Sequence, residues 1–410
     1  MKILQINNVY GVGSTGKLTK AIHHGLMSDG YSSVVIYGRG ASEEDKNLYR
    51  VCGNLYGKFN SFISRLCGIP YGGCFISTIK IISIIKKEKP DVVHIQCING
   101  NFVNIYRLIK WLNDNRIAVV LTLHAEFMYT ANCGHSLECN RWLNGCSMCP
   151  DPYYADKSYF FDRTHDSFIR MKRAFSGFND RLRVVSVSPW LMCRAKQSPI
   201  LKDKMHSVIL NAVDTSVFYY RNNKKRVYEY LASAEKDGIV FHATAMFRDT
   251  PDDIKGGEYV LKLAERMTEF IFIVAGKYKL SRSAPDNVFF LGEVQDQRLL
   301  AELYSAADIT VISSKRETFS MICAESLCCG TPVAGFRAGG PEQISMKEFS
   351  SFVSYGDVDE LERAARELIK LKRRVSPELI SEKAHKVYSQ KSMLLQYEQI
   401  YRGLQCEQRK

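Results

Sequence analysis

Residues 313–332 read SSKRETFSMICAESLCCGTP, and this stretch decides the fold of the chain. The apolar, β-branched run 308–312 precedes it, as expected for a buried parallel strand. A short helical pattern follows over 319–329, and the glycine and proline after it end the helix. Residues 332–336 then have the pattern of a second buried strand. The stretch therefore predicts a strand–loop–helix–strand unit whose loop opens at the carboxyl end of a strand, where open α/β sheets bind ligands.

Two carboxylates frame this loop, Glu317 before the helix and Glu325 inside it. The first-turn amides of Ser320 and Met321 have no partners within the helix and carry the positive end of its dipole. Such an end suits the phosphates of a nucleotide, and ionised glutamates on either side can accept hydrogen bonds from sugar hydroxyls. The alternative is that Glu317 is a capping acid and Glu325 a solvated helix residue.

The spacing Glu317-x7-Glu325, with the run GGPE at 339–342 after the next strand, resembles the signature of retaining family 4 glycosyltransferases. The resemblance implies the GT-B fold, an α/β fold in which two Rossmann-like domains with parallel sheets face each other across a cleft. It also implies that Glu317 contacts the transferred sugar and that Glu325 holds the ribose hydroxyls. The loop residues expected to bind the donor with them are Phe319, Ser320 and Met321.

Length and composition are typical of a multidomain globular protein. The 410 residues are enough for two to three domains, and the charged fraction is 24%. No apolar run reaches the roughly 18 residues of a membrane span. The N-terminal residues enter a strand without a signal-peptide pattern, which predicts a cytoplasmic protein. The net charge of +13 points to anionic partners; since no nucleic-acid module accompanies it, we predict a nucleotide and the anionic inner face of a membrane, and no nucleic acid.

The domain boundaries follow from the resemblance. The run 208–218 resembles the family segment that ends the first domain and leads into a hinge. We therefore predict an N-terminal Rossmann-like acceptor domain over 1–212, a C-terminal nucleotide-sugar domain over 213–390, and a final helix, 391–410, that packs back on the first domain.

A glycine-rich loop, 11–17, follows the first strand. Glycines at a strand-to-helix turn let a ligand approach the backbone closely. The spacing is neither a Walker loop nor a complete dinucleotide fingerprint, so a tight turn without a ligand is the alternative. The resemblance implies that Gly13 and Gly16 lie near the acceptor and the departing phosphate, with Gly16 among the donor-binding residues.

His124 follows the predicted strand 118–123. The resemblance implies that this histidine contacts the donor sugar near the reacting bond. Relatives often have an aspartate directly after it, whereas this chain has Ala125 and Glu126, so a role for Glu126 in binding hydroxyls is left open.

A cysteine-rich insertion, 127–152, comes next, and its cysteines are Cys133, Cys139, Cys146 and Cys149. A C-x2-C pair after two further cysteines matches the ligand set of a tetrahedral zinc ion. Four thiolates would fill every position, so such a zinc would be structural. The alternative is a set of free thiols. A similar insertion is expected in the polysaccharide-assembly branch of the family.

Two basic residues follow the strand 239–245: Arg248 and, seven positions later, Lys255 before a Gly-Gly pair. The resemblance implies that they grip the nucleotide diphosphate. Fixed cations stabilise the charge that grows on a leaving phosphate, and they do so without a metal. The alternative is two surface charges.

Two further segments of the first half have helical patterns. Residues 56–71 mix aromatic side chains with Lys58 and Arg65, which fits either a partly buried helix or a basic-aromatic membrane contact. Residues 75–87 predict a helix whose buried side consists of Ile76, Ile79, Ile82 and Ile85.

We therefore predict a retaining glycosyltransferase that needs no cofactor for catalysis. It would move a hexose-type sugar from a nucleotide-diphosphate sugar to a lipid-linked saccharide during bacterial synthesis of O-antigen, capsule or exopolysaccharide. Its catalytic residues would be Glu317, His124, Arg248 and Lys255. One alternative is an epimerase or phosphorylase of the same fold, which works without an acceptor. Another is a binding adaptor that uses the positive charge.

Overall fold

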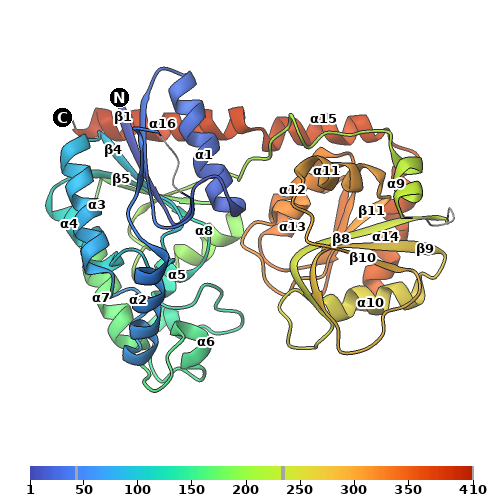
Figure 1. Ribbon diagram of the computed structural model, residues 1–410, viewed down its shortest axis with the longest axis horizontal. Helices are drawn as coiled ribbons and strands as arrows, with labels where there is room; N and C mark the ends of the chain where they lie inside the picture. The colour runs from blue at the N-terminus through green and yellow to red at the C-terminus, as the bar shows by residue number, and fades with distance from the viewer. Residues whose placement is uncertain (42–44, 232–235, 409–410) are drawn as a thin grey trace. The chain divides into compact units, whose positions relative to one another are not determined.

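The computed structural model describes residues 1–41, 45–231 and 236–408, which form two compact α/β units (Figure 1). The first unit contains Met1–Leu210 and the chain from Met393 onward, and the second contains Asn211–Ser392. The prediction from sequence placed these boundaries after residues 212 and 390. In the described residues no helix is long and apolar enough to cross a bilayer.

The first unit is built on a parallel sheet of seven strands in the order β3-β2-β1-β4-β5-β6-β7. Its strands are β1 (Lys2–Asn7), β2 (Ser32–Tyr37), β3 (Leu48–Arg50), β4 (Val92–Ile95), β5 (Ala118–Leu123), β6 (Leu182–Ser186) and β7 (Met205–Val208). Its helices are α1 (Gly13–Ser28), α2 (Asn54–Cys67), α3 (Phe75–Glu88), α4 (Ile105–Asp114), α5 (Phe127–Thr130), the 3₁₀ helix η1 (Arg141–Asn144), α6 (Pro152–Asp156), α7 (Thr164–Phe175), α8 (Pro189–Ala195) and most of α16 (Gln390–Gln408).

The second unit has a parallel sheet of six strands in the order β10-β9-β8-β11-β12-β13. Its strands are β8 (Gly238–Arg248), β9 (Phe270–Lys279), β10 (Val288–Gly292), β11 (Ile309–Ile312), β12 (Val333–Phe336) and β13 (Ser350–Val353). Its helices are α9 (Lys224–Tyr230), α10 (Gly257–Arg266), α11 (Gln297–Ala306), α12 (Met321–Cys328), α13 (Pro341–Ile344), α14 (Val358–Lys372) and α15 (Pro377–Tyr388).

Apolar strands form the core of each unit because helices cover both faces of its sheet. In the second unit, α10 and α14 pack their apolar sides with the strands into one cluster that includes Leu261, Phe272 and Leu361. On the other face, Tyr304 of α11 lies edge-on to Phe241 of β8, with 4.8 Å between the ring centroids. Two parallel sheets enclosed in this way confirm the predicted α/β, GT-B-type fold class.

The C-terminal helix α16 packs on the first unit through polar groups as well as apolar ones. The Tyr401 hydroxyl lies 2.7 Å from Nδ1 of His94 on β4, and the Tyr397 hydroxyl lies 3.0 Å from that of Thr122 on β5. Nε2 of His94 meets the same threonine hydroxyl at 2.7 Å. Burial lowers the pKa of His94 to about 3, so a neutral ring joins helix and sheet.

Two predicted helices differ in the structure. Helix α1 begins at Gly13, in the glycine loop itself, and not after it. Helix α3 was predicted to bury four isoleucines, which is wrong for its first turns: Ile76 and Ile79 are 72% and 53% exposed, whereas Ile82 and Ile85 are buried. The regular spacing of apolar residues identifies one face of a helix but does not show whether anything covers that face.

Candidate active site

The second sheet reverses its direction of growth at β8. The chain runs outward from β8 through β9 to β10 and then returns to the other side of β8 with β11. Such a switch point is where open parallel sheets bind ligands, outside the carboxyl ends of the strands. The loops after β8, β11 and β12 emerge side by side at this edge, since the three strands are neighbours. The loops after β8 and β11 hold Lys255, Glu317, Phe319 and Ser320; Arg248 ends β8, Met321 and Glu325 lie in α12, and Gly16 lies in α1 of the first unit.

Lys255 and Glu317 meet at this edge. Nζ of Lys255 donates a hydrogen bond to Oε1 of Glu317 over 2.6 Å, and both side chains remain partly exposed. One residue comes from the loop after β8 and the other from the loop after β11, 62 positions apart. The contact therefore places a cation and a carboxylate side by side at the switch point, while their binding of a donor stays a prediction.

The loop that carries Lys255 is fixed to the end of β11. The hydroxyl of Ser313 donates to the carbonyl of Lys255 over 2.8 Å, and the amide of Lys315 donates to the carbonyl of Ile254 over 2.8 Å. Gly256 follows with φ +67°, and a Cβ there would lie 2.2 Å from the Ser313 carbonyl oxygen. Only glycine fits, because both the backbone angle and the space exclude a side chain.

The loop after β12 holds Glu317 from the other side. The Glu317 amide donates to the carbonyl of Ala338 over 3.0 Å, and the Gly340 amide donates to the carbonyl of Glu317 over 2.9 Å. The carboxylate of Glu342 accepts hydrogen bonds from the amides of Ala338 and Gly339. Glu342, noted in the sequence only as part of the GGPE run, thus fixes the turn that positions Glu317.

Helix α12 starts beside Glu317 with a strained residue. Ser320, its N-cap, has φ +81°, an uncommon angle for a residue other than glycine, and its hydroxyl accepts from the amide of Cys323 over 3.4 Å. The amides at the start of the helix, including that of Met321, lack helical partners. Phe319, which was expected to bind the donor, has its side chain almost entirely buried.

Glu325 lies one helical turn into α12 and is partly exposed. The hydroxyl of Tyr304 donates to Oε2 of Glu325 over 3.2 Å. Burial, reinforced by this carboxylate, raises the pKa of Tyr304 well above its usual range, so the phenol stays protonated and can only donate to Glu325. Tyr304 therefore orients the glutamate, a role that sequence reasoning missed.

Arg248 is the last residue of β8, and about half of its side chain is exposed. Its guanidinium lies 4.0 Å from a carboxylate oxygen of Asp253, which is buried in the same loop as Lys255. Burial raises the pKa of Asp253, and the charges of Arg248 and Lys255 act in the opposite direction. Both cations are thus close to one buried acid. Sequence reasoning missed Asp253 because an aspartate in a polar loop gives no sign of being buried.

The first unit has its own switch point, between β1 and β4. His124 follows β5, and its Nε2 lies 2.8 Å from the side-chain oxygen of Gln96, which follows β4. Burial lowers the pKa of His124 to about 4, so it is a neutral donor to this glutamine at neutral pH. Gly16 lies in the first turn of α1, where a Cβ would come within 3.0 Å of Val9. Close packing of the turn explains this glycine, while Gly13 has open space around it.

Glu126 is fully buried. Its carboxylate accepts hydrogen bonds from the hydroxyls of Tyr129 and Ser136, each over 2.7 Å, and pairs with Arg194 at 3.3 Å. Arg194 also lies over the ring of Trp142, with 4.9 Å to its centroid. This network anchors the start of the cysteine-rich segment and gives the carboxylate of Glu126 protein partners.

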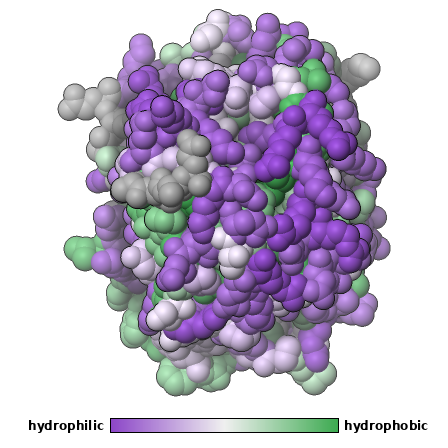
Figure 2. Space-filling model, turned by 90° about the vertical axis from the view of Figure 1, so that its right-hand side faces the viewer, coloured by the Kyte–Doolittle hydropathy of each residue, from purple (hydrophilic) through white to green (hydrophobic). Residues whose placement is uncertain are grey.

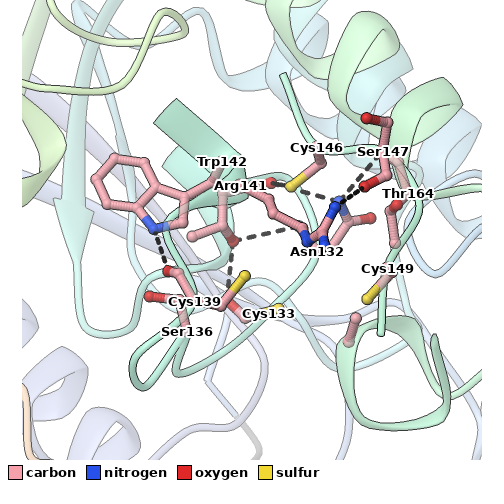
Figure 3. Close-up of a pocket in the computed structure, with 12 residues that line it drawn as sticks. Asn132, Cys133, Ser136, Cys139, Arg141, Trp142, Cys146, Ser147, Cys149 and Thr164 are labelled. Carbon is pink, nitrogen blue, oxygen red and sulfur yellow. Dashed lines mark hydrogen bonds between the residues drawn. The ribbon is translucent and has the colours of Figure 1, made fainter. Parts of the chain in front are cut away.

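The four cysteines of the insertion line one small pocket together with Asn132, Arg141, Trp142 and Thr164 (Figure 3). Figure 3 shows the sulfur atoms distributed around the pocket. Among the residues that the structure describes, no three His, Cys, Asp or Glu side chains are arranged so that they could hold a metal ion. The pocket is thus not a preformed metal site, and a structural zinc ion at Cys133, Cys139, Cys146 and Cys149 stays a prediction.

Residues 251–387 match the family model "Glycosyl transferases group 1". This segment includes Lys255, Glu317, Glu325 and the glycine turn, so the match covers most of the candidate site.

The whole chain is similar to known proteins at low identity. It is 21% identical to the "Putative colanic acid biosynthesis glycosyl transferase WcaC" of Escherichia coli K12, over 98% of this chain and 100% of the relative. Sucrose-phosphate synthase from Thermosynechococcus elongatus has the same fold, with a TM-score of 0.68, 17% identity and 98% of each chain covered. Anabaena Alr3699/HepE, solved in complex with UDP-glucose, has a TM-score of 0.64 at 15% identity, with 98% and 99% covered.

The two parallel sheets give the chain the GT-B fold of its solved neighbours. The family match, together with the full-length relative, supports its assignment to group 1 of the glycosyl transferases.

Proposed function

We propose that this protein is a retaining, metal-independent glycosyltransferase that takes a hexose-type sugar from a nucleotide-diphosphate donor. The observation that carries the proposal is the contact between Lys255 and Glu317, held by glycine turns at the switch point of the second sheet. A lysine beside a glutamate can bind a phosphate and a sugar hydroxyl of one molecule at the same time.

Different residues of the second unit bind different parts of the donor. Arg248 and Lys255 bind the diphosphate, with the amides of Ser320 and Met321 at the start of α12. Glu325 accepts hydrogen bonds from the ribose hydroxyls, and Glu317 accepts them from the sugar. Alr3699/HepE has the same fold and was solved in complex with UDP-glucose, which supports a nucleotide sugar as the class of ligand.

The configuration of the anomeric carbon is retained because the acceptor attacks it from the same face that the leaving group departs from. The bond between the anomeric carbon and the phosphate oxygen breaks, and its electron pair stays on the phosphate. The acceptor hydroxyl bonds to the anomeric carbon on the same face and passes its proton to that phosphate oxygen. Arg248 and Lys255 stabilise the growing charge, so the step needs no divalent ion. His124, neutral at pH 7, donates its one N–H to Gln96, so its Nδ1 accepts a hydrogen bond from a sugar hydroxyl and the ring does not act as an acid.

The acceptor we propose is a lipid-linked saccharide of a bacterial surface polysaccharide. Similarity over the full length to a colanic acid biosynthesis enzyme supports this class of product. The positive net charge of +13 supports work at the anionic inner face of a membrane.

The test is a thermal-shift screen of nucleotide sugars followed by an activity assay. A true donor raises the melting temperature by mass action, by an amount equivalent to about 2.7 kcal/mol at 100 times its Kd. The stabilising donor should then release its nucleotide much faster when a lipid-linked acceptor is added. Equal release without acceptor would favour the epimerase or phosphorylase alternative. Stabilisation by no nucleotide sugar would contradict the proposal.

A further inference from the structure

Helix α2 exposes its apolar side, whereas a surface helix of a globular unit normally buries that side. Its buried residues are Gly57 and Ser64, the small and polar ones. Its large apolar residues point to solvent: Leu55, Phe59 and Phe62 are 83%, 62% and 53% exposed. A surface helix normally turns such a stripe to the core, because each exposed apolar side chain forgoes the free energy of burial. The first unit therefore leaves the apolar side of α2 uncovered.

The start of α3 continues the same surface. Ser77 and Thr78 are buried, whereas Phe75, Ile76 and Ile79 are exposed. The two helices are in direct contact: the amide of Ile76 donates to the Tyr56 hydroxyl over 3.1 Å, and the amide of Cys74 donates to the side chain of Asn60 over 2.7 Å. The exposed residues of α2 and α3 thus form one surface.

A third segment adds aromatic side chains to this surface. Tyr159, Phe160 and Phe161 are exposed and follow one another in edge-on contacts. The amide of Tyr159 donates to the carbonyl of Arg65 on α2 over 3.0 Å, and the Arg65 guanidinium donates to the Tyr159 hydroxyl over 3.0 Å. We call the exposed apolar residues of α2, the start of α3 and 159–161 the apolar face. Figure 2 shows another side of the molecule, where hydrophilic side chains dominate.

The charge on α2 and on α3 up to Lys87 has one sign, whereas Asp162 directly follows Phe161 in the third segment. Between residues 46 and 87 the sequence has no Asp or Glu, and its basic residues are Lys46, Arg50, Lys58, Arg65, Lys80, Lys86 and Lys87. On a protein partner or a second copy of this chain, the residues around an apolar area can carry charge of either sign. Phospholipid with anionic headgroups offers an apolar layer directly below negative charge, which matches exposed Phe and Leu beside Lys and Arg.

The apolar face borders the edge of the first sheet where the predicted acceptor-side residue lies. Tyr71, in the loop between α2 and α3, donates from its hydroxyl to the carbonyl of Asn132, in the segment after β5 and His124. Its ring packs on Phe127 of the same segment, 5.5 Å between centroids. The loop between α2 and α3 thus joins the apolar face to the segment that follows His124.

We propose that the apolar face inserts into the interfacial layer of an anionic membrane and so brings the strand ends of the first unit to lipid-linked acceptors. The role of membrane binding in reaching an acceptor rests on the proposed function, but the test of membrane binding does not. Binding to lipid needs neither donor nor activity, so the two can fail separately.

The experiment is co-sedimentation of the full chain with vesicles of phosphatidylcholine alone or mixed with phosphatidylglycerol. The wild type should bind the mixed vesicles, more weakly as salt rises, and should bind the neutral ones poorly. A variant with Leu55, Phe59 and Phe62 changed to Gln should bind at least about ten-fold more weakly, because its buried apolar contact with the lipid is lost. Its folding and its stabilisation by the donor should match those of the wild type.

Two controls separate the alternatives. Changing Tyr230, Leu379 and Leu395 to Gln removes three exposed apolar side chains that are not part of the apolar face and should leave vesicle binding intact. Glu317→Gln should also bind vesicles normally. Wild type that ignores both vesicle types would overturn the proposal. So would a dimer in solution that the Leu55/Phe59/Phe62 variant dissociates, because a second copy would then cover the apolar face.

Discussion

The two strand-end edges of this protein have the same topology and opposite character. In the second unit, the edge at the switch point holds charged side chains fixed by backbone hydrogen bonds, with Lys255 against Glu317. In the first unit, the edge holds an uncharged pair, His124 and Gln96, and borders an exposed apolar surface. Parallel sheets with a switch point offer a ligand site in both cases, but the loops decide which ligand it is. In our proposal the second edge binds the nucleotide sugar, and the first binds the saccharide acceptor.

The largest effect should come from breaking the charged edge. Glu317→Gln keeps the size of the side chain but removes its charge, and we expect kcat to fall by on the order of 10² to 10³. Lys255→Ala should cost a similar factor and also weaken donor binding. Because the two groups are in contact, the double variant should lose much less than the product of the single losses. Steady-state kinetics of the three variants tests this.

Substitutions at the edge of the first unit should lower activity less. Gln96→Ala leaves His124 neutral and removes its hydrogen-bond acceptor at 2.8 Å, so it should lower activity by a smaller factor than Glu317→Gln. A larger loss at Gln96 than at Glu317 would contradict the assignment of the charged edge as the centre of the donor site.

The second effect concerns acid. Burial lowers the pKa of His23 and His124 to about 4 and that of His94 to about 3, all in the first unit, and that of His242 to about 4 in the second. Unfolded histidines take up protons below about pH 6.5 while these stay neutral in the fold, so stability is present above that pH and falls as the pH drops toward 4. Burial also lowers the pKa of His206 in the first unit. With four such histidines against one, the first unit should be the more acid-sensitive.

The protein supplies its own probe for this difference, since Trp111, Trp142 and Trp190 all lie in the first unit. Urea unfolding followed by tryptophan fluorescence should shift to lower urea between pH 7 and pH 5 and should not shift between pH 7 and pH 8.5. Far-UV circular dichroism reports both units, and it should show a smaller shift for the unfolding of the second unit. Equal shifts of both probes would argue against the uneven distribution.

The sequence predicted the charged edge better than the apolar one. Strand–loop–helix patterns and the Glu317-x7-Glu325 spacing placed the donor-side residues on the right loops, because parallel strands bring their carboxyl ends to one edge. The roles of Tyr304 and Asp253 were not predictable, since both depend on burial among residues distant in the chain. The exposure of Ile76 was missed for a related reason. Periodicity defines a face, whereas a face is covered or left open by the tertiary structure.

A smaller effect should follow from disturbing the turn that fixes Lys255. Gly256→Ala forces a side chain into a left-handed backbone position and against the Ser313 carbonyl, so we expect a loss of at least about 2 kcal/mol in the free energy of unfolding. Donor stabilisation should fall as well. Gly134→Ala is the matched control, because its Cβ would meet nothing within 4 Å. Similar losses in both variants would show that the turn is not under the inferred constraint.

The smallest effect on activity should come from the cysteine pocket, which belongs to the uncharged edge but touches no ligand in our proposal. We expect one zinc ion per chain by elemental analysis, bound after the side chains of Cys133, Cys139, Cys146 and Cys149 converge, because four thiolates complete a tetrahedral site. Changing Cys146 and Cys149 to Ser should remove the metal and lower the melting temperature, with only a modest loss of activity. Cys193→Ser, at an exposed cysteine outside the pocket, should change neither. Purified protein without zinc, whose four pocket thiols all react with a thiol reagent in the folded state, would leave Glu126 and Arg194 as the main anchor of the segment.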